Sequence, residues 1–374
     1  MKQILIFPLM SALLFSVSSQ AFETKATNAL LLDADTGTIL FEKDADIPMP
    51  PASMSKLMTV YVLFEALKNG RLSMEDEFVV SENAWRIGGA ASGGSTMFLN
   101  PGEKVKIKDL LRGIIIQSGN DACITVAENL AGSETAFAEI LNEKAKELGL
   151  TGSSFKNATG LPDPQHRMTA RDLAKLAQVL IQKFPEYYSI FSEKEFTYNG
   201  IKQDNRNPLL YRVGGADGLK TGHTIESGYG LTGALKTTDG RRLVVIVNGL
   251  KTIRERDSES AKLATYGMAG FKVTTLISAD KIVEKIPVWL GAEDSVEVIT
   301  EKEVKVTLPL SKKEPKVTIV YDTPVKAPIK KGDVLAHLII KDENINEKVN
   351  LLAVKDIEKA GYFKRVKQII SSWF

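Results

Sequence analysis

The sequence is poor in the residues that build disulfide frameworks and histidine metal centres. Among its 374 residues there is one cysteine, Cys123, and there are three histidines, His166, His223 and His337. One cysteine cannot form an intramolecular disulfide, and scattered histidines without paired cysteines do not match the spacing of zinc sites. We therefore expect no metal site. Cys123 lies in an apolar stretch and is predicted to be a small buried residue.

Neither sign of charge is in clear excess, and long hydrophobic runs are also scarce. The chain has 48 Lys and Arg against 46 Asp and Glu, a formal net charge of +2. This balance argues against a nucleic-acid binder, which would be strongly basic. An apolar run over 4–17 is short for a membrane span and precedes Ser19-Gln20-Ala21, a small-x-small pattern. We predict that residues 1–21 are a signal peptide that is cleaved after Ala21, and that the mature protein leaves the cytoplasm.

Apolar periodicity over 22–275 predicts an α+β domain. Strand patterns occur near both ends of this stretch, and helical patterns occupy its middle. Because the two kinds of element do not alternate, a parallel βαβ fold is not expected. Thr169 and Asp172 form a plausible capping box at the start of one helix. The expected strands are 29–42 as a hairpin, 228–237 and 241–249, and the expected helices are 53–69, 107–116, 121–130, 134–148, 169–183 and 258–268.

Two further parts follow this domain. Over 276–352, apolar residues alternate with polar ones at period 2, which predicts a small all-β domain without chemistry of its own. The tail, 353–374, places apolar and aromatic residues on one helical face and carries five basic against two acidic residues. A basic amphipathic helix of this kind is typical of an interfacial membrane anchor. The alternative is a helix that packs against the protein's own domains.

Three short motifs occur in order: Ser53-Met54-Ser55-Lys56, Ser118-Gly119-Asn120 and Lys220-Thr221-Gly222. Each is weak alone, since Ser-x-x-Lys occurs three times in the chain and Ser-x-Asn twice. On a helix, however, residues three apart share a face. Pro50 and Pro51 place Ser53 near a helix N-terminus, where backbone N–H groups favour a developing negative charge. The set therefore suggests a serine nucleophile with a lysine base.

A lysine acts as a base only when it is neutral. The pKa of Lys56 would have to fall from about 10.4 toward 7, which corresponds to roughly 4–5 kcal/mol of differential stabilisation. Burial and a second cation both lower a lysine pKa. Lys220 is the expected second cation.

The ordered motifs resemble the signature of serine β-lactamases and penicillin-binding proteins. With Ser-Gly-Asn in the middle, the sequence is similar to the low-molecular-mass D,D-carboxypeptidases, the penicillin-binding protein 5 and 6 type of serine peptidase. Longer stretches, 117–123 and 217–224, extend the likeness, which covers nearly the whole chain. It implies a catalytic domain with an antiparallel sheet and a helical cluster, then the all-β domain and the amphipathic tail.

The resemblance also implies roles for individual residues. Ser53 would be the acylated nucleophile, Lys56 its general base and Ser118 a proton relay to the leaving amine. The backbone N–H groups of Ser53 and His223 would form the oxyanion hole. Arg256 would assist in carboxylate recognition, with Arg254 as the alternative. The expected substrate-binding residues are Asn120, Lys220, Thr221, Gly222, His223 and Arg256.

The implied activity is removal of the terminal D-alanine from peptidoglycan pentapeptide stems, without a metal or an organic cofactor. β-Lactam antibiotics would acylate the same serine. The enzyme would lie at the periplasmic face of the bacterial inner membrane, held by residues 353–374, and would not bind nucleic acid.

Of three alternatives, the first lacks a required element and the other two remain open on the sequence. A class A β-lactamase would need a glutamate three residues before the leucine, in the pattern Glu-x-x-Leu-Asn. This chain has two Leu-Asn pairs, and the residues at that position are Thr96 and Ala138. A D,D-endopeptidase of the same fold would cleave similar bonds in cross-linked peptides. A non-catalytic peptidoglycan-binding scaffold would carry the same domains with an inactive site.

Overall fold

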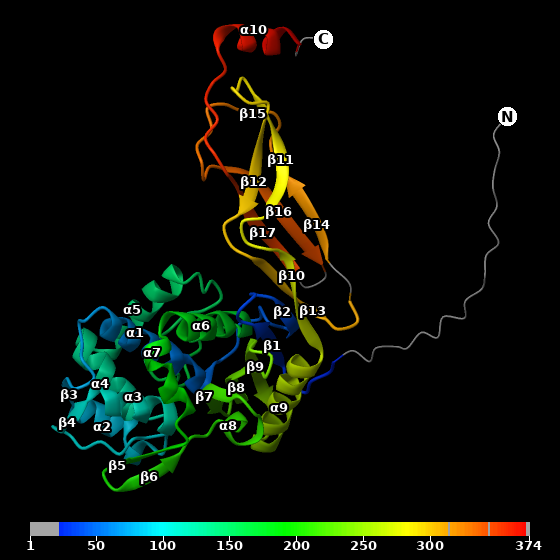
Figure 1. The fold of residues 1–374 in the computed structure, drawn as a ribbon. Helices are drawn as coiled ribbons and strands as arrows, with labels where there is room; N and C mark the ends of the chain where they lie inside the picture. The colour runs from blue at the N-terminus through cyan, green and yellow to red at the C-terminus, as the bar shows by residue number, and fades with distance from the viewer. Residues whose placement is uncertain (1–21, 313–314, 343–344, 372–374) are drawn as a thin grey trace, which may run out of the picture.

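The structure is a computed structural model that describes residues 22–312, 315–342 and 345–371. Figure 1 shows a rounded part built by the first two thirds of the chain, an elongated β-rich part beside it, and a helix at the far end. The expected fold class is confirmed: an α+β domain is followed by an all-β unit and a C-terminal helix. The predicted signal peptide, 1–21, lies outside the described residues.

A five-stranded antiparallel sheet forms the framework of the rounded part. Its strand order is β2 (Ile39–Lys43), β1 (Asn28–Asp33), β9 (Arg242–Leu250), β8 (Gly228–Lys236) and β7 (Ala216–Thr224). The predicted hairpin and both later strands are therefore confirmed. The first strand of the chain pairs with β9, so the sheet joins segments that are far apart in the sequence. β7 lies at the edge of this sheet, and among the described residues no strand pairs with its outer side.

A helical cluster packs beside the sheet around α1 (Lys56–Lys68), which is buried on almost every side. A helix inside a core carries apolar side chains on most of its faces, and the buried Lys56 and Glu65 are exceptions in α1. Its neighbours include α4 (Asn120–Ala131), α5 (Glu134–Glu147) and α6 (Ala170–Lys183), all predicted from apolar periodicity. Thr169 caps α6 by accepting from the Asp172 N–H at 3.0 Å. The carboxylate of Asp172 binds Gly152 and Ser153 instead of returning to Thr169, so the capping box is only half formed.

Two predicted helices differ from the structure. The helix expected at 258–268 is α9 (Ile253–Ala269), and its first turn starts earlier because the Thr252 side chain accepts from the Glu255 N–H. After Ile253 the turn consists of the charged residues Arg254, Glu255 and Arg256, so no apolar period indicated it. The helix expected at 107–116 is α3 (Ile107–Arg112), which continues as a π-helical turn over Gly113–Gln117.

Several short elements complete the rounded part. They were not predicted, since each is too short for a periodic pattern to be recognised. They are β3 (Glu77–Val79) paired with β4 (Lys104–Lys106), β5 (Glu195–Tyr198) paired with β6 (Ile201–Asp204), α2 (Glu82–Gly88), α7 (Pro185–Tyr188), α8 (Leu209–Arg212) and the 3₁₀ turns η2 (Ala90–Ser92) and η4 (Ser189–Ser192). The helix expected at 53–69 is present as a 3₁₀ turn, η1 (Ala52–Ser55), that runs directly into α1.

The β-rich part begins with β10 (Phe271–Ile277), which pairs with β13 (Val304–Pro309). The boundary expected between 275 and 276 falls inside β10. A six-stranded sheet follows, and its inward side chains form a separate core that includes Ile286 and Leu338. Its strand order is β14 (Lys316–Val320), β16 (Val334–Asp342), β17 (Ile345–Ala353), β12 (Ser295–Thr300), β11 (Ile282–Trp289) and β15 (Val325–Lys326).

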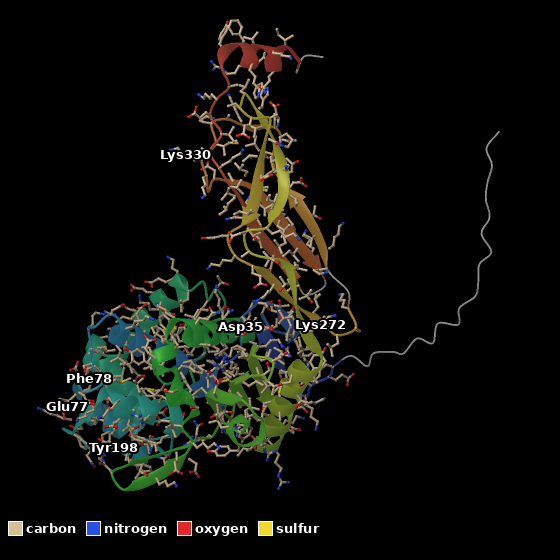
Figure 2. All side chains as sticks on the ribbon, viewed as in Figure 1. Asp35, Glu77, Phe78, Tyr198, Lys272 and Lys330 are labelled. Carbon is tan, nitrogen blue, oxygen red and sulfur yellow. The ribbon has the colours of Figure 1, made fainter. Side chains whose placement is uncertain are left out.

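Polar contacts join the two parts. The buried Thr307 hydroxyl on β13 donates to the carboxylate of Asp33 at 2.8 Å, and the Thr307 N–H donates to Thr38 at 3.3 Å. In Figure 2, Asp35 and Lys272 lie close to this junction, whereas Lys330 lies far along the β-rich part.

The last helix, α10 (Tyr362–Ser371), lies at the end of the β-rich part that is remote from the rounded part (Figure 1). It starts later than expected because β17 runs to Ala353 and the stretch after it is still tied to the β-rich part, with bridges from Ile357 to Ile329 and from Lys359 to Gly291. Lys364 donates to the backbone of Ala292 at 2.9 Å, which fixes the helix to the β11–β12 turn. Tyr362 and Phe363 are 70% and 88% exposed. No helix among the described residues is long and apolar enough to cross a membrane.

Candidate active site

Ser53 lies in the 3₁₀ turn η1 that leads directly into α1. The residue before it, Ala52, has a positive φ of 48°, a conformation that non-glycine residues rarely adopt and that is often found at functional sites. The loop 157–168 closes on this turn through Gly160, whose φ is +77°. A Cβ at Gly160 would lie 2.0 Å from the Ala52 carbonyl oxygen, so only glycine lets the loop approach the serine.

Ser118 follows the π-helical turn and also has a positive φ, 61°. π-Helical turns frequently mark functional sites because they shift the residues that follow them. Here the turn ends α3 and places Ser118 and Asn120 at the start of α4. Both side chains are buried at the junction of the sheet and the helical cluster.

The third motif lies on β7, a strand that was not predicted from the sequence. Its glycines hide it, since glycine has low strand propensity. Gly222 shows why glycine is required: a Cβ there would lie 2.7 Å from the Pro51 carbonyl oxygen. The absent side chain lets the edge strand approach the turn that carries Ser53.

Lys56 is fully buried and makes three hydrogen bonds. Its Nζ donates to Ser53 Oγ at 2.9 Å, to Asn120 Oδ1 at 2.8 Å and to the Thr159 carbonyl oxygen at 2.5 Å. Three acceptors match the three N–H bonds of an ammonium group. When Lys56 loses one proton, its lone pair is available to accept a hydrogen bond from the Ser53 hydroxyl.

Lys220 binds the second serine. Its buried Nζ donates to Ser118 Oγ at 2.9 Å and to the Thr221 carbonyl oxygen at 3.1 Å. Ser53 and Ser118 both face one cavity of about 380 Å³. The cavity is lined by Ser53, Ser95, Ser118, Arg206, Thr221, Gly222, His223, Tyr229, Ile253 and Arg256.

The two buried lysines have lowered pKa values. Burial is the main cause that lowers the pKa of Lys56 to about 8, and the cation of Arg206 adds to the effect. Burial, followed by the charge of Lys56, lowers the pKa of Lys220 well below its usual range. The charge of Lys56 thus lowers the pKa of Lys220, but the cation that adds to the lowering at Lys56 is Arg206 and not the expected Lys220.

The structure brings together almost all of the predicted site residues. Arg256 lines the cavity, whereas Arg254 is exposed and is not part of its lining. Two donors of Arg256, Nε and Nη2, contact Asp257 Oδ1 at 3.2 and 3.1 Å. The guanidinium of Arg256 is therefore partly neutralised by its own neighbour in the chain.

Arg206 and Ser95 also line the cavity, and neither was among the residues predicted from the sequence. Arg206 Nη1 donates to Ser95 Oγ at 2.6 Å, and no carboxylate pairs with Arg206 in the described part of the chain. The Ser95 carbonyl oxygen accepts from the Asn120 N–H at 2.8 Å. Arg206 lies in a polar loop, and nothing in the sequence distinguishes it from the other basic residues. Only the tertiary fold brings it to Ser53.

Cys123 and His166 are buried near the site but have no nucleophilic environment. Burial raises the pKa of the Cys123 thiol to about 12 and lowers the pKa of His166 to about 4. A thiol with so high a pKa stays protonated and unreactive at neutral pH. Within the described ranges, no group of three or more His, Cys, Asp or Glu side chains could hold a metal ion.

Comparison with known proteins decides the family. The family model described as D-alanyl-D-alanine carboxypeptidase matches residues 15–252 of this sequence. A second family model, described as penicillin-binding protein 5, C-terminal domain, matches residues 271–359. The chain belongs to the D-alanyl-D-alanine carboxypeptidase family. The predicted family, fold and serine carboxypeptidase activity are thereby confirmed.

Individual relatives agree with this family over almost their full lengths. The chain is 39% identical to D-alanyl-D-alanine carboxypeptidase DacC of Escherichia coli, covering 97% of this chain and 96% of that protein. It is 36% identical to DacA of the same organism, with 93% and 89% covered. The solved structure of penicillin-binding protein 5 from Haemophilus influenzae superposes with a TM-score of 0.82 at 35% identity, covering 90% of this chain and 98% of that one.

Lys56 should cost the protein stability at neutral pH. A pKa of about 8 in the folded state, against the usual 10.5, corresponds to a loss of at most about 3 kcal/mol in the free energy of unfolding. Between these two values the folded state releases the proton first, so stability rises with pH. We expect Lys56→Met to be more stable than the native protein at pH 7, with a gain that shrinks as pH rises from 8 toward 10. Urea unfolding at several pH values measures this difference, with Lys236→Met at an exposed position as the control. A gain that does not change with pH would contradict the explanation.

Proposed function

We propose that Ser53 is the acylated nucleophile of this carboxypeptidase and that Lys56 is its general base. The observation that carries the proposal is the 2.9 Å contact between Lys56 Nζ and Ser53 Oγ, made by a fully buried lysine whose pKa is lowered to about 8. A base whose pKa lies near the working pH is neutral often enough to accept a proton and strong enough to take it. Ser118 and Lys220, in contact at 2.9 Å, form a second proton path beside the first.

The substrate would add to the free edge of β7 as an extra strand. Peptides commonly bind to sheet edges in this way, through backbone hydrogen bonds. Nδ2 of Asn120 makes no hydrogen bond within the described residues and is free to hold a peptide carbonyl, since Oδ1 is occupied by Lys56. The terminal carboxylate would lie at Lys220, Thr221, Arg206 and Arg256, where the two guanidinium groups supply positive charge and Lys220 and Thr221 supply hydrogen-bond donors.

Catalysis then follows in two steps. Neutral Lys56 takes the hydroxyl proton as Ser53 Oγ attacks the carbonyl between the last two D-alanines. The backbone N–H groups of Ser53 and His223 stabilise the oxyanion. As the intermediate collapses, the peptide bond breaks, and the leaving D-alanine amine receives a proton through Ser118. Water then hydrolyses the Ser53 ester and leaves a tetrapeptide, and a β-lactam would form the same ester.

The direct test measures D-alanine released from a diacetyl-Lys-D-Ala-D-Ala tripeptide. Release should disappear in Ser53→Ala and Lys56→Ala, and covalent labelling by a fluorescent penicillin should disappear in Ser53→Ala. Because Lys56 must be neutral, the acylation rate of the native enzyme should rise with pH and level off above about 8. Penicillin labelling without D-alanine release would favour an endopeptidase that needs cross-linked substrate, and a folded protein that does neither would be a scaffold.

Arg206 should contribute to binding of the terminal carboxylate. We expect Arg206→Gln to lower kcat/KM by about tenfold, the typical loss for one charge-assisted contact at a solvated site. A substrate whose terminal carboxylate is replaced by an amide should lose this dependence, since it offers no anion. Arg254→Gln, which changes an exposed arginine nearby on α9, is the matched control. An equal effect of Arg206→Gln on both substrates would argue for a structural role instead.

We further propose that the mature chain works at the periplasmic face of the inner membrane, after cleavage at Ala21, with α10 as a peripheral anchor. The catalytic unit would be 22–275, the all-β unit 276–352 and the anchor 353–374. Support comes from the exposed apolar side chains of Phe363 and Ile370, at 88% and 52%, beside basic residues on the same helix. The remote position of α10 would keep the cavity away from the bilayer (Figure 1).

Sedimentation with vesicles of anionic lipid tests this anchor. We expect the mature protein to bind, and the double variant Phe363→Ser, Ile370→Ser to lose most binding, because apolar burial at the interface drives it. Leu310→Ser, which removes another exposed apolar side chain at 57% exposure, should bind as before. Unchanged binding of the double variant would reject α10 as the anchor.

A further inference from the structure

A carboxylate on α5 holds the segment that supplies one of the three acceptors of Lys56. Glu134, the first residue of α5, accepts a hydrogen bond from the Ala158 N–H at Oε1, over 3.0 Å. The next residue, Thr159, carries the carbonyl oxygen that accepts from Lys56 Nζ. Acidic residues are common in the first turn of a helix, where they interact favourably with the helix dipole. Here, however, the carboxylate also binds the backbone of another segment, directly before the acceptor of the buried lysine.

The peptide groups around Ala158 are fixed from two sides. The Ala158 carbonyl oxygen accepts from the hydroxyl of Thr59 at 2.8 Å, and Thr59 lies on α1, one turn after Lys56. Ala158 and Thr59 are both buried, so water cannot easily replace either bond. A buried N–H group that loses its acceptor is costly. Glu134 therefore fixes the orientation of the peptide group that leads into the Thr159 carbonyl.

α5 holds the same segment at a second point. The side chain of Asn142 binds both polar backbone atoms of Phe155, the N–H at 2.8 Å and the carbonyl oxygen at 2.8 Å. Unlike Glu134, Asn142 carries no charge. The two contacts thus separate two effects that Glu134 combines, namely holding the segment and placing a negative charge near Lys56.

The charges of Glu134 and Lys56 act on each other. Burial lowers the pKa of Lys56 to about 8, and the negative charge of Glu134 opposes this lowering. Burial raises the pKa of Glu134, whereas the Ala158 N–H and the charge of Lys56 oppose that rise. Each group therefore favours the charged form of the other.

Other titratable and charged groups also interact with Lys56. They come from α4, β7 and two loops, and they are Asp121, Cys123, Lys220, His166 and Arg206. With pKa values of about 12 and about 4, the Cys123 thiol and His166 are uncharged near pH 7. The carboxylate of Asp121 is bound by the Thr96 hydroxyl and by the N–H groups of Met97 and Leu99. Glu134 differs from Asp121 because it acts through the segment that binds Lys56.

We propose that Glu134 is a positioning residue of the acylation step, which holds the Thr159 carbonyl against Lys56 through the Ala158 N–H and favours the ammonium form of Lys56 by its negative charge. Glu134 does not line the cavity, so it acts only through Lys56. The inference deepens the proposed function and rests on it, because Lys56 is the base of that reaction.

The test measures the rate at which a fluorescent penicillin acylates the protein, as a function of pH. Glu134→Gln keeps an oxygen that can accept from the Ala158 N–H and removes the charge. Its half-maximal rate should occur about one pH unit lower than in the native protein, because the ammonium form is less favoured. Its plateau rate should stay close to the native one. Glu134→Ala also loses the acceptor, so its plateau should be about tenfold lower, the typical loss for one charge-assisted contact.

Two further variants serve as controls. Asn142→Ala loosens the same segment without a change of charge, so it should lower the plateau and leave the midpoint in place. Glu139→Gln, at an exposed position of α5, should change neither. A merely structural role of Glu134 would give Glu134→Gln the pattern of Asn142→Ala, and an unshifted midpoint would overturn the proposal. A native plateau in folded Glu134→Ala would overturn the holding role.

Titration of Lys56 by NMR separates this inference from the proposed function. Lysine labelled with ¹³C at Cε reports the protonation of each amine without turnover, and the signal of Lys56 is assigned by its loss in Lys56→Ala. A lower pKa of Lys56 in Glu134→Gln than in the native protein supports the role of the charge, and an equal pKa overturns it. Acylation that survives in Lys56→Ala would reject the proposed base, which is a different result.

Discussion

A buried positive charge is the constraint on which the rest of this structure depends. Lys56 is surrounded by protein, and an ammonium group in such a place is costly unless each of its N–H bonds is accepted. The three acceptors come from η1, from the start of α4 and from the loop 157–168. Segments far apart in the chain must therefore converge within hydrogen-bond distance of one nitrogen atom. The positive φ values of Ala52 and Ser118 and the close approach at Gly160 occur in the same converging segments.

The second lysine makes the arrangement chemically useful. Lys220 approaches from the edge of the sheet, and its charge and that of Lys56 repel each other in a region with little water. The pair is most stable when one of the two is neutral, which is the state that acid–base chemistry at a serine requires. Burying two lysines lowers the stability of the fold, and the same burial favours the neutral lysine that catalysis uses. Sites of this kind commonly trade stability for function.

Much of this architecture could be predicted from the sequence, for reasons that differ between elements. Long helices such as α5 and α6 show a clear apolar period, and the order of the three motifs indicates the chemistry. The strand β7 could not be predicted, because the glycines that let it approach Pro51 also remove its strand pattern. The π-helical turn before Ser118 has no periodic signature. Arg206 depends on tertiary contacts alone, since its side chain reaches Ser95 from a loop far along the chain.

The free edge of β7 has a consequence for the protein's behaviour in a crowded compartment. An unpaired edge strand is a template for another chain, and proteins usually protect such edges with proline, with a bulge or with an inward-pointing charge. Proline would remove a backbone donor from the strand that is proposed to bind substrate. Lys220, a charge that points inward from this edge, is one of the protective features that remains compatible with binding. The same lysine would then serve two purposes, as part of the reaction centre and as a barrier to self-association through the edge.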